Sequence, residues 1–203
     1  MKTKISSRLD GLAGYAFAEV DNEVAKLKKL GITPIDFGVG DPKEPTPEII
    51  RDAIKKAIDK RKSSGYPSYT GTDEYRQAIS KWCKRRFGVN LDYNNEITST
   101  IGAKEAVFNF PEAFLNHGDY VIMPNPGYPP YERGTLFAEG RPYFVPLLRE
   151  NSFLMDLEKI PREIVKKSKI LWINYPSNPT GSVAPEKFIK KVIDFGHDHN
   201  IIV

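Results

Sequence analysis

Three turns in the sequence carry residues whose types and spacing could bind a ligand. Residues 102–104, Gly-Ala-Lys, open an expected helix, where unpaired backbone N–H groups and the helix dipole favour a phosphate. Tyr128 lies among prolines that restrict the backbone, so its ring can act as a fixed stacking surface. Asn178 precedes Pro179, which confines it to extended geometry where a strand is expected to end. All three turns follow expected strands, and ligands of open α/β sheets bind at such strand ends.

Each turn taken alone also has an ordinary structural explanation. Residues 102–104 match neither a Walker loop nor a GxGxxG turn, so a plain strand-to-helix connection explains them well. Lys104 is, on spacing alone, best explained as a solvated surface lysine. The loop around Tyr128 could be a packed proline-aromatic loop, and the Asn178-Pro179 pair could be a simple turn after a strand. The ligand-binding interpretation therefore depends on the turns occurring together.

Other reactive residues in the sequence indicate structural roles. His117 stands where a helix is expected to end, which is typical of a capping residue. His197 and His199 are two positions apart and do not share a helix face, which argues against a metal site. No GxSxG turn or supported carboxylate pair is present. The single cysteine, Cys83, cannot form an internal disulfide, and we expect a buried structural thiol in a reducing compartment.

The composition is typical of a globular protein with a buried core. Of the 203 residues, 40% are hydrophobic, and the acidic and basic side chains are interspersed, with a net charge of +4. Because no block of like charge occurs, no nucleic-acid partner is expected. The first residues lack the apolar core of a signal peptide, and no apolar run reaches membrane-spanning length. We therefore expect a cytoplasmic α/β protein with no membrane partner.

Apolar periodicity predicts the elements that would position these turns. Strands alternate with helices from residue 96 onward, which indicates parallel pairing through right-handed crossovers. A mostly parallel sheet covered by helices is therefore expected. The expected strands are residues 96–100, 120–123, 142–145, 169–174 and 201–203. The expected helices are residues 17–30, 47–58, 73–87, 102–116, 131–138, 156–167 and 185–199.

The helices before residue 96 have clear capping signals and apolar stripes. Thr46 is the expected N-cap of the second helix, and Thr72 or Asp73 that of the third. Gly88 is expected to end the third helix. The expected buried positions are Ile50, Ala53, Ile54, Ala57 and Ile58 in the second helix and Tyr75, Ala78, Ile79, Trp82 and Cys83 in the third.

Six segments in a fixed order resemble the class I and II aminotransferases, which use pyridoxal 5'-phosphate. The segments are GYAFAEV, DFGVGDP, SYTGTDEYRQAI, TIGAKEAV, PNPGYPPY and NYPSNPTG. The resemblance extends from Ser7 to Val203. The arm with Tyr15 and the Gly-Ala-Lys turn are most similar to LL-diaminopimelate aminotransferases, and aspartate and alanine aminotransferases share most of the rest.

The resemblance implies a fold and a division of the chain. Residues 1–45 would form an N-terminal arm, a helix and part of the small domain. Residues 46–203 would form the first part of a three-layer α/β/α large domain that binds the cofactor. The substrates would be an amino acid and a 2-oxo acid, and the protein would be a homodimer with a shared active site.

The resemblance also implies roles for individual residues. Backbone N–H groups of Gly102, Ala103 and Lys104 would hold the cofactor phosphate. Tyr128 would stack on the pyridine ring, and the amide of Asn178 would donate to its phenolic oxygen. The remaining implied contacts are Tyr69 with the phosphate of the neighbouring subunit, and Tyr15, Gly40 and Lys104 with the substrate.

The family's catalytic groups are expected elsewhere. The Schiff-base lysine, the aspartate that pairs with the pyridine nitrogen and the arginine that binds the α-carboxylate would all lie beyond Val203, so no catalytic residue is assigned here. We also expect that the apolar strand at residues 201–203 needs further chain, or a second polypeptide, to cover it. A non-catalytic or split-gene subunit is the alternative to half an aminotransferase. A nucleotide-binding Rossmann domain is disfavoured by the missing glycine fingerprint.

Two Asn-Pro bonds are expected to be cis. Asn125-Pro126 and Asn178-Pro179 each follow an expected strand and lie in or beside a proposed cofactor contact. Each loop must reverse sharply within a residue or two, and a cis bond achieves this in a tight turn. Related aminotransferases have cis prolines in these two loops, so the resemblance leads to the same expectation.

Overall fold

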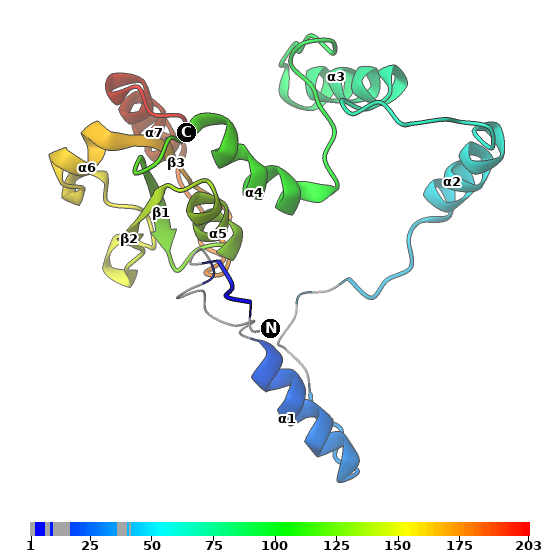
Figure 1. The fold of residues 1–203 in the computed structure, drawn as a ribbon, viewed down its shortest axis with the longest axis horizontal. Coiled ribbons are helices and arrows are strands. Elements are labelled where there is room, and N and C mark those ends of the chain that lie inside the picture. Colours follow the sequence, from blue (N-terminus) through cyan, green and yellow to red (C-terminus); the bar gives the residue numbers. More distant parts are fainter. Residues whose placement is uncertain (1–2, 7–8, 10–16, 36–39, 41) are drawn as a thin grey trace. The chain divides into compact units, whose positions relative to one another are not determined.

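The computed structural model describes residues 3–6, 9, 17–35, 40 and 42–203. The chain divides into two compact units, one of residues 13–99 and the other of residues 1–12 and 100–203. Figure 1 shows the chain coloured along its sequence. Tyr15 lies outside the described residues. The expected domain boundary after residue 45 stays a prediction.

The helices and strands follow one another largely as the sequence predicts. In residues 13–99 the helices are α1, Phe17–Lys29, α2, Glu48–Lys60, and α3, Asp73–Phe87. In residues 100–203 the strands are β1, Tyr120–Asn125, β2, Arg141–Pro146, and β3, Ser168–Leu171. The helices of the same unit are α4, Gly102–Phe114, α5, Pro129–Phe137, α6, Arg162–Lys167, and α7, Glu186–His199, with 3-10 turns η2, Arg149–Asn151, and η3, Leu157–Lys159.

The three strands form one parallel sheet in the order β2-β1-β3. Ile122 of β1 is in register with Tyr143 of β2 and with Leu171 of β3. Ile202 forms a parallel bridge to Ile170, so residues 201–203 run beside β3 at the other edge. The parallel pairing that the alternation of elements predicted is thereby confirmed.

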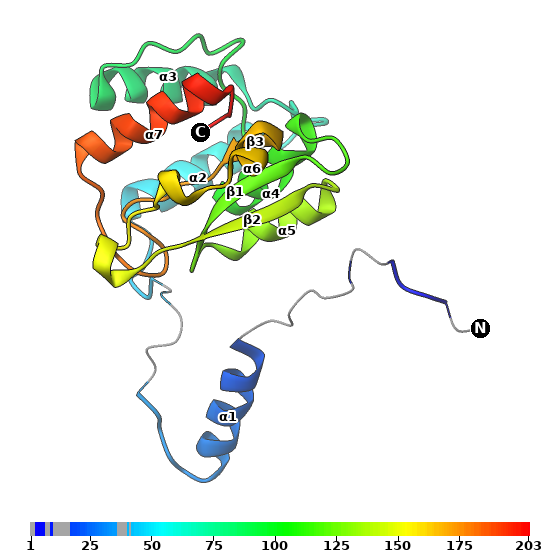
Figure 2. The same cartoon turned by 90° about the vertical axis from the view of Figure 1, so that its left-hand side faces the viewer.

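Helices cover both faces of this sheet because alternate residues of the strands point in opposite directions. On one face, Ile122 and Leu171 pack in a buried cluster with Phe188 and Val192 of α7. On the other face, Val121, Met123 and Ile170 pack with Tyr131 of α5, and Val107 of α4 lies against them. Figure 2 gives a second view of these layers. The expected three-layer α/β/α arrangement is confirmed for this unit.

Helix α2 forms as predicted, but its cap and its burial differ from the expectation. The N-cap is Pro47 rather than Thr46, and no side chain accepts a hydrogen bond there. None of the α2 residues is buried, and Ile54, in the middle of the apolar stripe, is 53% exposed. The stripe is apolar and correctly spaced, but no apolar layer of its own unit covers it.

Helix α3 has the predicted caps and an unexpected inner face. The hydroxyl of Thr72 accepts a hydrogen bond from the Tyr75 N–H at 3.4 Å, and Gly88 takes the left-handed conformation that ends the helix. Tyr75 and Trp82 remain exposed, however, and the buried residue of α3 is Arg76. The expected inner face is therefore confirmed only in part: Ile79 and Cys83 are partly buried on the same side as Arg76, whereas Tyr75, Ala78 and Trp82 are exposed.

Three expected elements are absent, divided or shorter in the described chain. Residues 96–100 form no strand: the Ser99 N–H donates to the Thr70 carbonyl at 3.0 Å, and no ladder continues from that bond. The expected helix at residues 156–167 is divided into η3 and α6, because Pro161 cannot continue a helical hydrogen-bond pattern and becomes the N-cap of α6. Strand β3 ends at Leu171 rather than at residue 174.

Candidate functional site

The turns singled out in the sequence lie on one side of the sheet in residues 100–203. Strands β1 and β3 are parallel neighbours, so the loops that contain Tyr128 and Asn178 leave from the same edge. Helix α4 ends a few residues before β1 begins, and its Phe110 ring lies 5.7 Å from the ring of Trp172, just after β3. The start of α4 therefore also lies on the carboxyl-end side of the strands.

The start of α4 offers backbone donors that have no hydrogen-bond partner within the helix. Ile101 is the N-cap and has no side-chain acceptor, and its own N–H donates to the Glu105 carboxylate. The next N–H groups have no partner within a helix. Gly102 has φ +80°, and a Cβ added there would meet no atom within 4 Å. This end, with the exposed Lys104, has the donors and the space that a phosphate needs.

The loop after β1 is tightly closed beneath Tyr128. The Asn125-Pro126 bond is cis, as predicted. A Cβ on Gly127 would lie 2.5 Å from the Pro124 carbonyl oxygen, so only glycine fits this position. At the start of the loop, the Leu147 N–H donates a hydrogen bond to the Asn125 carbonyl at 2.8 Å. The backbone that leads to Tyr128 is thus fixed on both the sheet side and the turn side.

The ring of Tyr128 is supported by a row of aromatic side chains. It packs edge-on against Tyr131, with centroids 5.7 Å apart, and Tyr131 is stacked on Trp172 at 5.0 Å. Burial raises the pKa of the Tyr131 hydroxyl, and the nearby Tyr128 adds a smaller contribution in the same direction. The buried Nε1 of Trp172 has no hydrogen-bond partner in the described part of the chain. Sequence reasoning assigned Trp172 only to a buried strand and missed this arrangement.

The loop after β3 presents the Asn178 side chain on a closed turn. The Asn178-Pro179 bond is cis, as predicted, and the Tyr175-Pro176 bond is also cis, which the sequence reasoning missed. The Asn178 N–H donates to Oδ1 of Asn174 at 3.0 Å, and the Gly181 N–H donates to the Ser177 carbonyl at 2.7 Å. The backbone is therefore held from within the loop, while the Asn178 side chain is exposed.

The other residues implied by the resemblance belong to residues 13–99. The ring of Tyr69 is 96% exposed on a turn, and Gly40 is exposed with no atom within 4 Å of an added Cβ. Tyr15 lies outside the described residues. Their roles, like the cofactor contacts of Tyr128 and Asn178, stay predictions.

The described residues form no second site of comparable chemistry. A shallow groove of about 540 Å³ between η3 and α7 is lined by residues such as Leu157, Lys187 and Phe195, and contains none of the predicted site residues. Among the described residues no three His, Cys, Asp or Glu side chains are grouped as metal ligands would be. None of the helices in this part of the chain is long and apolar enough to cross a membrane.

Comparison with known families decides between the interpretations. The family model described as aminotransferase class I and II matches residues 32–203. The chain belongs to this family. The class I and II aminotransferases use pyridoxal phosphate, and the resemblance drawn from the six sequence segments is confirmed.

Individual aminotransferases resemble the chain over about half of their own length. It is 48% identical to the LL-diaminopimelate aminotransferase of Aquifex aeolicus, covering 98% of this chain and 52% of that protein. The LL-diaminopimelate aminotransferase 2 of Trichormus variabilis is 45% identical, with the same two coverages. The chain thus spans about half the length of the curated relatives it matches.

Solved aminotransferase structures have the same fold. Apo-BacF from Bacillus subtilis superposes with a TM-score of 0.90 at 35% identity, covering 99% of this chain and 51% of that one. A single mutant of Thermus thermophilus aspartate aminotransferase superposes with a TM-score of 0.89 at 28% identity, covering 98% and 52%. The expected fold class is therefore confirmed by sequence and by structure.

The residues at this edge fit the cofactor of the family by their chemistry. A phosphate needs backbone donors and a cation, which the start of α4 and Lys104 supply. A pyridine ring needs a flat aromatic neighbour such as Tyr128, whose ring is held by Tyr131. A phenolic oxygen needs a donor such as the exposed amide of Asn178. The loops that contain Tyr128 and Asn178 leave from the same edge of one sheet, which is compatible with a single ligand.

Proposed function

We propose that the protein transfers an amino group from an amino acid to a 2-oxo acid with pyridoxal phosphate as its cofactor. The observation that supports this most is the gathering of the α4 start, Tyr128 and Asn178 at the carboxyl ends of β1 and β3, in a chain of the aminotransferase family. Relatives with 48% and 45% identity are named LL-diaminopimelate aminotransferases. We therefore propose LL-diaminopimelate as the amino donor, ahead of aspartate or alanine.

The proposed binding mode gives each described residue one task. The N–H groups of residues 102–104 bind the phosphate, and the helix dipole adds to their attraction. Tyr128 packs on the ring, and the Asn178 amide donates a hydrogen bond to the ring oxygen. When bound, pyridoxal phosphate supplies an electron sink for the carbanion at the amino acid's α-carbon. The protein's residues bind and orient this group, and backbone hydrogen bonds at Asn125 and Asn178 hold the two loops in place.

The proposed assembly is a homodimer with a shared active site. The ring of Tyr69 is 96% exposed on its own chain, as a side chain that reaches another subunit would be. Tyr69 would contact the phosphate of the neighbouring subunit, and Tyr15, Gly40 and Lys104 would line the substrate site. The cytoplasmic location expected from the sequence stays a prediction.

The family's lysine nucleophile provides a first test. Because the resemblance places this lysine beyond Val203, residues 1–203 expressed alone should show no transamination with 2-oxoglutarate and LL-diaminopimelate, aspartate or alanine. The protein expressed from its complete reading frame should be active, and the ranking of the three donors tests the proposed substrate. Turnover by residues 1–203 that is lost when one of their lysines is replaced would overturn this assignment. An inactive complete protein that still binds pyridoxal phosphate would favour the non-catalytic alternative.

The Asn178 side chain provides a second test. In the complete protein, Asn178→Ala should lower kcat/KM by about tenfold to a hundredfold, because it removes a hydrogen bond to a charged ligand atom. The thermal midpoint of the cofactor-free protein should not change, since the backbone of this loop is held by Asn174 and Ser177. Asn90→Ala, at an exposed asparagine in the other unit, is the matched control. A loss of stability with unchanged kinetics would reduce Asn178 to a turn residue.

A further inference from the structure

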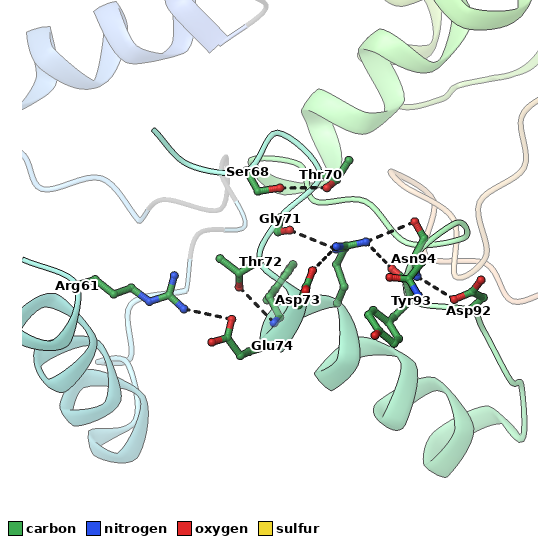
Figure 3. Close-up of polar contacts among 12 residues, drawn as sticks. Arg61, Ser68, Thr70, Gly71, Thr72, Asp73, Glu74, Asp92, Tyr93 and Asn94 are labelled. Carbon is green, nitrogen blue, oxygen red and sulfur yellow. Dashed lines mark hydrogen bonds and ion pairs between the residues drawn. The ribbon is translucent and has the colours of Figure 1, made fainter. Parts of the chain in front are cut away.

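Arg76 is the buried charged residue among the described residues of 13–99, and each nitrogen of its guanidinium donates a hydrogen bond. It is 8% exposed, whereas the other described residues of this unit are partly or fully exposed. Its Nε donates to the Gly71 carbonyl at 3.2 Å, and its Nη1 donates to the Tyr93 carbonyl at 2.7 Å. Its Nη2 donates to the Asp73 carboxylate. Figure 3 labels the partners Gly71, Asp73 and Tyr93. A buried charge that is paired in this way holds its partners in fixed positions.

One of those partners belongs to the turn that carries Tyr69. Within this turn the Gly71 N–H donates to the Ser68 carbonyl at 3.1 Å, and the hydroxyls of Ser68 and Thr70 lie 3.1 Å apart. From outside, the Ser99 N–H donates to the Thr70 carbonyl at 3.0 Å. Residues 68–71 are thus held by Arg76 on one side and by Ser99 on the other.

The conformation of Gly71 leaves this turn little freedom. Gly71 has φ +93°, and a Cβ added there would lie 2.9 Å from Oγ of Ser99. A side chain at this position would both strain the backbone and push the turn away from Ser99. Thr72 follows Gly71 as the N-cap of α3, and the helix begins at Asp73. The Gly71 carbonyl that accepts the Arg76 hydrogen bond therefore lies two residues before the helix.

The bonds surround a side chain that contributes nothing to the packing of its own unit. Tyr69 lies between Ser68 and Thr70, and its ring is 96% exposed. A fixed backbone beneath an exposed ring favours binding when the ring must contact a ligand, because less conformational entropy is then lost on binding.

We propose that Arg76 is a positioning residue that holds residues 68–71 so that Tyr69 meets the cofactor phosphate of the neighbouring subunit. This inference rests on the proposed function, which gives Tyr69 that contact. Arg76 itself does not touch the cofactor. Without its hydrogen bond to Gly71, the turn populates other conformations, and cofactor affinity falls by the fraction of molecules that lose the competent one.

A double-mutant cycle on cofactor affinity tests the proposal. In the protein expressed from its complete reading frame, Arg76→Gln and Tyr69→Phe should each raise the Kd for pyridoxal phosphate about tenfold. The double variant should bind within about twofold of Tyr69→Phe alone, because a mispositioned turn no longer matters once the hydroxyl is gone. Arg85→Gln, at an exposed arginine of the same helix, is the control and should leave Kd unchanged.

The outcomes separate this inference from the function on which it rests. If the increases in Kd caused by the two substitutions multiply in the double variant, Arg76 acts independently of Tyr69, and the positioning role is overturned. A Tyr69→Phe variant with normal affinity would remove the phosphate contact of Tyr69 from the proposed function, and the role of Arg76 with it.

Hydrogen exchange of the cofactor-free protein gives an independent measurement. Arg76→Gln should speed exchange of the Gly71 and Ser99 amides by about tenfold, while amides in the middle of α3 keep their protection. Unchanged exchange at both amides would overturn the proposal. If Arg76→Gln unfolds the unit, Gly71→Ala displaces the same turn from the Ser99 side, and its effect on Kd should likewise vanish in the Tyr69→Phe background.

Discussion

The two units of the chain are each stabilised internally by a different kind of interaction. In residues 100–203, Val121, Ile122, Leu171 and Val192 are completely buried between a sheet and its helices. In the described part of residues 13–99, the residue that is buried is Arg76, and it is held by polar bonds. An apolar stripe therefore identifies the side of a helix that could be buried, but burial itself needs a second apolar layer.

The largest expected difference between the units concerns matched isoleucines. Ile122→Ala should lower the free energy of unfolding by about 2–5 kcal/mol, because Ile122 is 0% exposed between β2 and β3 and leaves a cavity. Ile54→Ala, in the uncovered stripe of α2, should change it by less than about 1 kcal/mol. Urea unfolding of residues 1–203, followed by the fluorescence of Trp82 and Trp172 and by circular dichroism, measures both. Equal losses would show that the α2 stripe is buried in solution.

Matched glycines sharpen the same comparison at a smaller scale. A Cβ on Gly134 of α5 would lie 2.5 Å from the Phe108 carbonyl oxygen of α4, so Gly134→Ala must separate the two helices. It should destabilise residues 100–203 by about 1–3 kcal/mol. Gly65→Ala in the other unit meets no atom within 4 Å and should be neutral or slightly stabilising. The thermal midpoints of both variants give the answer, and a tolerated Gly134→Ala would contradict the close α4–α5 contact.

Two threonines test how much local caps contribute where apolar packing is sparse. Thr72→Ala removes the acceptor for the Tyr75 N–H and should destabilise α3 by about 1 kcal/mol. Thr46→Ala should have no effect, because the N-cap of α2 is Pro47 and no side chain caps that helix. Helix content measured by circular dichroism during thermal unfolding distinguishes them. An equal effect of Thr46→Ala would restore the cap expected from the sequence.

The smallest expected effect depends on pH and again lies in residues 13–99. Hydrogen bonds from the Asn94 N–H and the Asn95 side chain to Asp92 lower the pKa of its carboxyl below 3.8. Because the folded-state pKa is the lower one, the carboxylate stabilises the fold above pH 3.8, and this stabilisation is lost as the pH falls through the folded-state value. Asp92→Asn should therefore make helix content less sensitive to acid. An unchanged acid titration of helix content would contradict this.

Local sequence signals predicted much of the sheet-containing unit. The apolar runs at β1, β2 and β3 have the length of strands, and helical patterns separate them. Their parallel pairing therefore followed from the alternation of elements. Thr72 and Gly88 were found because caps depend on neighbouring residues. The two Asn-Pro cis bonds were predicted from the sharp reversal of their loops together with the resemblance to aminotransferases.

Features that depend on distant partners could not be predicted. Residues 96–100 have the β-branched pattern of a strand but lack a ladder in the described chain, and a sequence pattern alone does not supply a partner. Arg76 is one charged residue among several on α3, and the carbonyls that bury it come from both sides of the helix in sequence. At the candidate site, the types of Tyr128 and Asn178 were apparent, but the support from Tyr131, Trp172 and Asn174 was not.

The strand order β2-β1-β3, with residues 201–203 beyond β3, has a consequence for where a ligand can enter. From β1 the chain continues through α5 on one face and moves outward to β2. From β3 it continues through α7 on the opposite face and moves outward the other way. The two outgoing connections diverge, which makes the boundary between β1 and β3 a topological switch point. The position of this boundary is a property of the order of the strands, so substitutions in the Tyr128 and Asn178 loops can change which molecule is held there without changing the strand order.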